Sequence, residues 1–188
     1  MKKVIAEISA RHLHLSESDL AKLFGKDYKL KKYKDLSQPG EFAARETVEV
    51  IGPKGKFAKV RIIGPSRSKT QVELAASDCR QIGINAVWRI SGDHKKTPGA
   101  KIKGPKGSIV IKKGVIVPLR NLHISNEQAK LWKLKNKKTV SAKVGGSKAL
   151  VFKNIVVRVG DYHTSIHLDT DDANAAGLLS CSKIDLDI

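Results

Sequence analysis

Cysteine is scarce in this chain of 188 residues, and its scarcity excludes a disulfide-stabilised secreted protein. Cys79 and Cys181 lie far apart and form no CxxC motif, which is typical of the reducing cytosol. Long apolar runs are missing too, since no segment approaches the ~18 consecutive apolar residues of a membrane span. Glu7 interrupts the apolar run of the N-terminus too early for a signal peptide. The sequence therefore predicts a soluble, cytoplasmic protein.

Aromatic residues are also few, at 5% of the sequence, whereas positive charge is in excess. The chain has 36 Lys and Arg against 18 Asp and Glu, a formal net charge of +18. This charge indicates an anionic partner, which is nucleic acid, anionic lipid or a phosphate-bearing small molecule. Proteins that bind single-stranded nucleic acid stack bases on clustered aromatic side chains. No such cluster is present, so nucleic acid is disfavoured as the partner.

The sequence repeats itself in three blocks that occur in the same order. In the first block, RHLHLSESDLAKLFG (Arg11–Gly25) matches RNLHISNEQAKLWKL (Arg120–Leu134). Matching strand–turn–strand segments follow, and Thr70–Ile84 then matches Thr164–Leu178. We interpret the blocks as an internal duplication. Together with many short strands and Gly/Pro turns, it predicts a mainly β fold of two similar β-barrels, each capped by short α-helices.

Each copy of the first block predicts a strand that leads directly into a helix. Ser16 begins a capping box in one copy, and Ser125 begins one in the other. In the third block, Gly83 and Gly177 each follow a short helical segment and are expected to end it. The two halves should therefore share their local structure around these turns.

Two histidines one residue apart, His12 and His14, follow the apolar run at the start of the chain. The run alternates as a strand does, so both imidazoles are expected on the same face of a strand. Glu73, on a separate predicted strand, supplies a further oxygen ligand. Three converging nitrogen and oxygen ligands with open positions are typical of a catalytic metal site. We refer to His12, His14 and Glu73 as the first ligand set.

The repeat places Asn121, His123 and His167 at the corresponding positions of the second half, and we refer to these residues as the second ligand set. The alternative for both sets is ordinary surface chemistry, because an HxH pair is weakly specific for metal. Taken alone, Glu73 could be an exposed strand residue and His167 a structural histidine, with no metal at either. His94, in a basic loop, and His163 are placed outside both sets.

A Gly-Pro turn with flanking basic residues predicts a phosphate-binding corner. Arg61 and Arg67 flank this turn in VRIIGPSRSKTQVE, and Lys69 follows it. Backbone amides of a turn and planar guanidinium groups are well suited to phosphate oxygens. The alternative is that both arginines only solvate the edge of a sheet. Their position between the turn and Glu73 favours the phosphate site.

Six motifs together resemble the phosphate propanoyltransferase family, the phosphotransacylases of the propanediol-utilisation type. They span residues 9–177 in the family order: SARHLHLS, KDLSQPGEFAARETV, VRIIGPSRSKTQVE, SGDH, RNLHIS and HLDTDDANAAG. The resemblance implies one β-barrel from residues 11–118 and another from residues 1–10 with 119–188, the N-terminal strand crossing over. It also implies a reversible, metal-dependent reaction in which an acyl-CoA and phosphate give an acyl phosphate and coenzyme A.

The resemblance further implies two zinc ions, one held by the first ligand set and the other by the second. Arg67 matches the family's phosphate-holding arginine. Four residues match positions near coenzyme A: Ser9, Lys34, Arg61 and Asn174. The sequence places no Cys or Ser with a base as in a covalent acyltransferase. We therefore expect direct attack of phosphate on the thioester in a ternary complex.

The second ligand set departs from the family at RNLH, where Asn121 stands in place of a histidine. An amide carbonyl is a harder and weaker zinc ligand than an imidazole. We expect one metal held tightly by the first ligand set, and a second that is weak, exchangeable or absent. The alternative is that Asn121 still binds the metal through its amide oxygen.

The remaining expectations concern location, partners and alternative functions. Only eight residues precede SARHLHLS, whereas family members packaged in microcompartments carry an N-terminal extension, so we expect an enzyme outside any shell. No membrane partner is expected, and the sequence leaves open whether the protein forms a homodimer. The alternatives to the enzyme are a degenerate homologue that binds coenzyme A with little turnover and a basic nucleic-acid-binding β-barrel protein.

Overall fold

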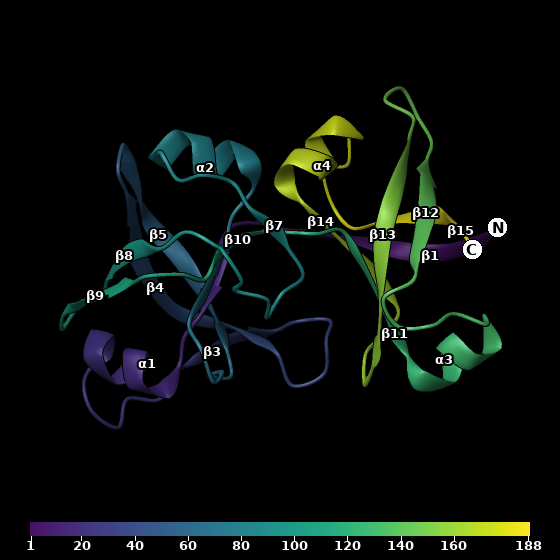
Figure 1. The fold of residues 1–188 in the computed structure, drawn as a ribbon. Coiled ribbons are helices and arrows are strands. Elements are labelled where there is room, and N and C mark those ends of the chain that lie inside the picture. Colours follow the sequence, from purple (N-terminus) through teal and green to yellow (C-terminus); the bar gives the residue numbers. More distant parts are fainter. The chain divides into compact units, whose positions relative to one another are not determined.

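A computed structural model describes all 188 residues, which divide into two compact units. The closed-barrel unit comprises residues 1–10 and 119–188, and the curled-sheet unit comprises residues 11–118. Each unit has its own hydrophobic core of buried aliphatic side chains. The structure is mainly β with four short helices, as the sequence predicted (Figure 1). None of these helices is both long and apolar enough to cross a membrane.

The closed-barrel unit is a six-stranded barrel with the strand order β1-β14-β11-β13-β12-β15. β1 pairs in parallel with β14 and antiparallel with β15, so the first strand of the chain closes a barrel that residues 119–188 otherwise form. The elements of this unit are β1 (Lys2–Ser9), β11 (Asn121–Ser125), α3 (Asn126–Leu131), β12 (Thr139–Val144), β13 (Leu150–Gly160), β14 (Ser165–Asp169), α4 (Thr170–Ala175) and β15 (Ser182–Asp187).

The curled-sheet unit holds one nine-stranded sheet, ordered β7-β10-β6-β2-β5-β4-β8-β9, with β3 paired to β4. Unlike the barrel of the other unit, this sheet does not close on itself, because β7 and β9 end it on either side. Its elements are β2 (His12–His14), α1 (Glu17–Phe24), β3 (Lys32–Asp35), β4 (Phe42–Gly52), β5 (Gly55–Gly64), β6 (Gln71–Glu73), α2 (Ala76–Ile82), β7 (Trp88–Arg89), β8 (Ala100–Lys103), β9 (Ser108–Ile111) and β10 (Val115–Pro118).

The internal duplication is visible in the helix caps of the two units. The backbone N–H of Asp19 donates to Ser16 Oγ at the start of α1, over 3.2 Å. The backbone N–H of Gln128 donates to Ser125 Oγ at the start of α3, over 3.1 Å. Both serines therefore satisfy a backbone donor that the helix itself leaves open. These caps confirm that each copy turns directly from a strand into a helix.

An equivalent ion pair also recurs in both units. Arg11 Nη2 lies 2.7 Å from Asp78 Oδ1 in the curled-sheet unit. Arg120 Nη2 lies 2.7 Å from Asp172 Oδ1 in the closed-barrel unit. In both pairs the arginine Nε also donates to the carboxylate, so each arginine makes two charge-assisted hydrogen bonds. Each pair ties the segment before a histidine strand to the helix of the third repeat block.

Candidate active site

His12 and His14 lie on β2, one residue to either side of Leu13. Leu13 is fully buried in the core of the curled-sheet unit. Because side chains alternate along a strand, burial of Leu13 turns both imidazoles to the opposite face of the sheet. β2 pairs with β6 in the register that puts His12 opposite Glu73, so the carboxylate lies on the face of the two imidazoles.

The first ligand set is brought together by this pairing. His12 Nε2 lies 3.5 Å from Glu73 Oε2, and His14 Nε2 lies 3.9 Å from Glu73 Oε1. One nitrogen or oxygen atom from each of the three side chains lies within 4.8 Å of the others. Two imidazoles and one carboxylate are a common donor set for zinc and related divalent metals. The donor chemistry and spacing therefore fit a metal ion at this position.

Two residues that the sequence did not single out hold the carboxylate of Glu73 in place. Gln71 Nε2 donates to Glu73 Oε1 over 2.6 Å, and Ser91 Oγ donates to the same oxygen over 2.9 Å. The side-chain oxygen of Gln71, Oε1, accepts a hydrogen bond from the backbone N–H of Gly92 and lies 3.0 Å from His94 Nε2. His94 thus supports the set without being a member of it. Such outer contacts orient metal ligands.

The electrostatics of the site favour the protonation states in which these groups bind a metal. Burial, with the charges of Arg67 and His12 nearby, lowers the pKa of His14 to about 3. Burial alone would raise the pKa of Glu73, but the two histidines and a hydrogen bond from Ser91 outweigh it and lower this pKa to about 2. At neutral pH His14 is therefore uncharged and Glu73 is ionised, as metal binding requires.

Arg67 follows β5 and is held beside the first ligand set. Its Nη2 pairs with Glu41 Oε1 at 2.8 Å, and its Nη1 donates to Ser91 Oγ over 3.3 Å. Ser91 therefore contacts both Arg67 and Glu73, and joins the guanidinium to the candidate metal ligands. The guanidinium is about one-third exposed, so it is accessible to a ligand. Nothing in the sequence pattern pointed to Glu41 or Ser91, although both lie in the quoted family motifs.

The four residues matched to coenzyme A positions are divided between the two units. In the curled-sheet unit, Arg61 pairs with His12 in the strand register, and its guanidinium donates to the carbonyl oxygens of residues 44 and 45. Lys34 is exposed on β3. In the closed-barrel unit, Ser9 ends β1 and Asn174 is exposed on α4.

The second ligand set lies on β11 and β14 of the closed-barrel unit. His123 Nδ1 lies 3.2 Å from His167 Nε2, and the His123 ring stacks on Tyr162 with centroids 4.3 Å apart. Asn121 is paired with His167 in the strand register, but its Nδ2 donates to the backbone carbonyl of Leu119 over 3.1 Å. The two histidines are therefore adjacent, whereas the Asn121 amide is engaged by the backbone.

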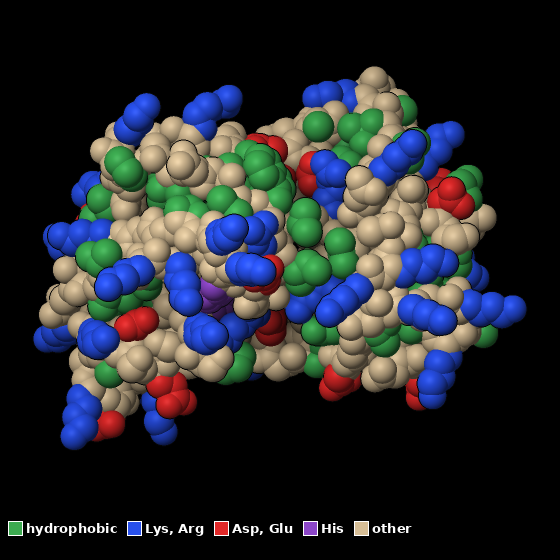
Figure 2. Space-filling view, viewed as in Figure 1, with side chains coloured by type: hydrophobic (Ala, Val, Ile, Leu, Met, Phe, Trp, Pro, Cys, Tyr) green, Lys and Arg blue, Asp and Glu red, His purple; other side chains and the backbone are tan.

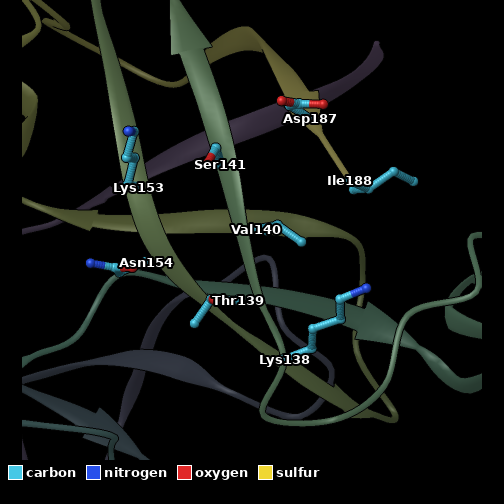
Figure 3. Close-up of a pocket in the computed structure, with 8 residues that line it drawn as sticks. All are labelled: Lys138, Thr139, Val140, Ser141, Lys153, Asn154, Asp187 and Ile188. Carbon is cyan, nitrogen blue, oxygen red and sulfur yellow. The ribbon is translucent and has the colours of Figure 1, made fainter.

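A shallow pocket of about 310 Å³ lies elsewhere in the closed-barrel unit (Figure 3). It is formed by β12, β13 and β15 and contains none of the residues predicted for the site. Figure 2 shows Lys and Arg side chains scattered across the visible face rather than gathered at one place. The excess of positive charge on this face, part of a net charge of +18, is therefore not confined to one patch.

Comparison with known proteins identifies the relatives of the chain. A family model described as Phosphate propanoyltransferase matches residues 5–179. A protein of that name from Leptotrichia buccalis is 46% identical over 177 residues, which cover 94% of this chain and 84% of the relative. A protein of the same name from Thermotoga maritima is 44% identical over 93% of this chain and 84% of the relative. Another from Listeria monocytogenes is 39% identical over 93% of this chain and 82% of the relative.

These similarities extend over nearly the whole chain and include both units. Together with the mainly β fold and a polar site, they define the protein as an acyltransferase enzyme. The chain belongs to the phosphate propanoyltransferase family. The resemblance found in the six sequence motifs is thereby confirmed.

Proposed function

We propose that the protein catalyses the reversible transfer of a short acyl group between coenzyme A and phosphate. The observation that carries this proposal is the hydrogen-bonded link through Ser91, whose Oγ contacts Glu73 at 2.9 Å and Arg67 at 3.3 Å. A guanidinium suited to phosphate therefore lies beside a donor set suited to a divalent metal. The reaction needs both, since it joins an anionic phosphate to the carbonyl carbon of a thioester.

Zinc would be held by the first ligand set, whose donors fit it. When bound, it supplies positive charge that neutralises phosphate or polarises the thioester carbonyl. The chain's own residues prepare the site for this metal. Gln71 and Ser91 fix the Glu73 carboxylate, and the low pKa of His14 keeps its imidazole available at neutral pH.

Arg67 would bind and orient the phosphate. Glu41 and Ser91 hold the guanidinium in one place, so two of its N–H groups lie in a fixed fork for phosphate oxygens. A phosphate oxygen then attacks the thioester carbon, the C–O bond forms, the C–S bond breaks, and coenzyme A leaves as a thiolate. Holding both reactants in this geometry removes much of the entropic barrier of a two-substrate reaction.

Direct attack by phosphate also agrees with the burial of Cys79. Cys79 is buried in the core of the curled-sheet unit, where it cannot meet a substrate. Ser91 is the hydroxyl that contacts the first ligand set, and its role here is to orient Glu73 and Arg67. We expect Ser91→Ala to retain measurable turnover, and wild-type enzyme mixed with acyl-CoA to show no acylated serine by mass spectrometry. Loss of all turnover together with an acyl-Ser91 peptide would contradict direct attack.

Coenzyme A is proposed to contact Ser9, Lys34, Arg61 and Asn174. The basic side chains among them would meet its phosphate groups, and the site of Arg61 beside His12 in the sheet supports this assignment. A cytoplasmic location stays a prediction. A degenerate homologue that binds coenzyme A without turnover, and a nucleic-acid-binding protein, are the alternatives that an assay distinguishes.

The test is an assay of purified protein with propanoyl-CoA or acetyl-CoA and phosphate. Release of free thiol and formation of acyl phosphate, trapped as the hydroxamate, are measured together, with metal content determined on the same sample. We expect both products in equal amounts, and none after the first-set metal is removed by a chelator. Binding of coenzyme A without either product would support the degenerate homologue. Tight binding of RNA or DNA with no turnover would support the other alternative.

A further inference from the structure

Gln71, two residues before Glu73 on β6, has both polar atoms of its side chain engaged. Its Nε2 donates to Glu73 Oε1 over 2.6 Å and to Ser91 Oγ over 2.8 Å. Its Oε1 accepts from the backbone N–H of Gly92 over 2.8 Å and lies 3.0 Å from His94 Nε2. Gln71 is 1% exposed, so water does not compete for these contacts. The amide therefore uses its two donors and its two lone pairs entirely within the protein.

Only one orientation of the Gln71 amide is compatible with these partners. The Glu73 carboxylate, ionised because of its low pKa, only accepts hydrogen bonds, whereas the backbone N–H of Gly92 only donates. Turned by half a rotation, the amide would put its oxygen against the carboxylate and its NH₂ group against the N–H of Gly92. The oxygen of Gln71 therefore faces Gly92 and His94, and its NH₂ group faces Glu73.

The direction of these bonds determines which ring nitrogen of His94 carries a proton. Gln71 Oε1 has no hydrogen to give, so His94 Nε2 has to be the donor of the 3.0 Å contact. Burial and the charges of Lys69 and Lys113 lower the pKa of His94, so the ring is neutral at pH 7 and has a single N–H. That N–H is on Nε2, and Nδ1 is the unprotonated nitrogen.

The fold holds the His94 ring next to β6. Thr97 Oγ1 donates to the His94 carbonyl over 3.0 Å and accepts from the backbone N–H of Gly114 over 2.9 Å. The carbonyl of Gly114 in turn accepts from the backbone N–H of Val72 on β6 over 2.9 Å. A Cβ at position 114 would lie 3.3 Å from the His94 ring and 2.8 Å from the carbonyl oxygen of Thr70, so glycine permits this close approach. The loop that carries His94 is therefore tied to the strand of Glu73.

We infer that His94 is a positioning residue of the first ligand set, acting through Gln71. As an Nε2–H donor to the Gln71 oxygen, it keeps the Gln71 NH₂ group on Glu73 Oε1, which also accepts from Ser91. Both lone pairs of that oxygen are then occupied. The other oxygen, Oε2, lies 3.5 Å from His12 Nε2 and is left to bind a divalent metal. The inference rests on the proposed function only for the expectation that a metal takes part.

The test is a titration of the metal-free protein with Co²⁺ in competition with a chelator, and the equivalent that Glu73→Gln removes is assigned to the first ligand set. His94→Phe keeps a ring but removes the donor, and should weaken this equivalent roughly tenfold. His94→Gln keeps an N–H donor and should recover most of the affinity. His163→Phe is the matched control, since this histidine lies in the closed-barrel unit, and it should leave the first-set metal unchanged.

A double-mutant cycle distinguishes action through Gln71 from a general structural role. In a Gln71→Leu background the link to Glu73 is already broken, so His94→Phe should cost at most about twofold in further metal affinity. Thermal melts of the metal-free proteins accompany the titrations. A merely structural His94 would lower Tm when replaced and leave the affinity for Co²⁺ as it was. Long-range ¹H–¹⁵N NMR of the imidazoles provides an independent readout, with the proton of His94 expected on Nε2.

Four results would overturn the inference. These are a first-set affinity that His94→Phe leaves unchanged, a full further loss of affinity in the Gln71→Leu background, a His94 proton found on Nδ1, and a wild-type protein from which Glu73→Gln removes no metal. None of these readouts depends on turnover. A protein that meets the expectations for His94 and transfers no acyl group retains this inference and loses the proposed function.

Discussion

Arg67→Ala removes the guanidinium proposed to hold phosphate, and leaves the first ligand set intact. In the structure this guanidinium has two polar partners, Glu41 at 2.8 Å and Ser91 at 3.3 Å. Neither partner is a metal donor of the set. A substitution at this position therefore separates phosphate binding from metal binding, which few other changes near the site would do.

The size of the effect follows from the contacts that are lost. Each hydrogen bond to a charged group contributes about 1.5–3 kcal/mol, and a planar guanidinium makes two of them to phosphate. Removing both should lower kcat/KM for phosphate roughly 10²–10⁴-fold. The cost to stability should be small, because the Arg67–Glu41 pair is about one-third exposed on both sides. Such a pair contributes at most about 1 kcal/mol, or a few degrees in Tm.

The assay is steady-state release of free thiol from acyl-CoA at increasing phosphate, beside thermal melts of the same samples. Arg67→Lys keeps the charge but lacks the planar fork, so it should recover only part of the activity. Glu41→Gln is the matched control, because it removes the negative charge paired with Arg67 and keeps the guanidinium. An unchanged kcat/KM for phosphate in an Arg67→Ala protein that melts like the wild type would refute the assigned role.

Three further predictions concern the residues around the site. Burial lowers the pKa of His14 to about 3, well below the value of the unfolded chain. On acidification the unfolded chain therefore takes up a proton on His14 before the folded protein does. The metal-free protein should lose about 2 kcal/mol of unfolding free energy between pH 7 and pH 5. Denaturant melts at both pH values measure this loss, which His14→Gln should largely abolish. Gln71→Leu should weaken zinc binding by the first ligand set about 10–100-fold in competition with a chelator, and unchanged affinity would contradict its positioning role. Arg11→Ala should cost about 1.5–3 kcal/mol and Arg120→Ala less, because Asp78 is more buried than the partner of Arg120, and equal losses in urea melts would be inconsistent with this reasoning.

Local patterns in the sequence determined several features of this protein without help from the tertiary structure. The alternation around Leu13 is enough to put His12 and His14 on one face, because the two-residue period belongs to any strand. The capping serines at positions 16 and 125 are equally local, since a cap acts within one turn of the chain. The repeat of these features revealed the duplication and led to the family.

Only the tertiary structure decided which distant side chains contact the ligand sets. Ser91 reaches Glu73 because the segment after β7 meets β6 in the folded sheet, and no spacing in the sequence encodes that meeting. The same holds for Glu7, which in the sequence only interrupts an apolar run at the N-terminus. It reaches His167 because β1 pairs with β14, although 160 residues separate these two positions in the chain. Strand pairing depends on the burial of whole sheet faces and not on any short segment, so the partners of a strand appear only when the barrel closes.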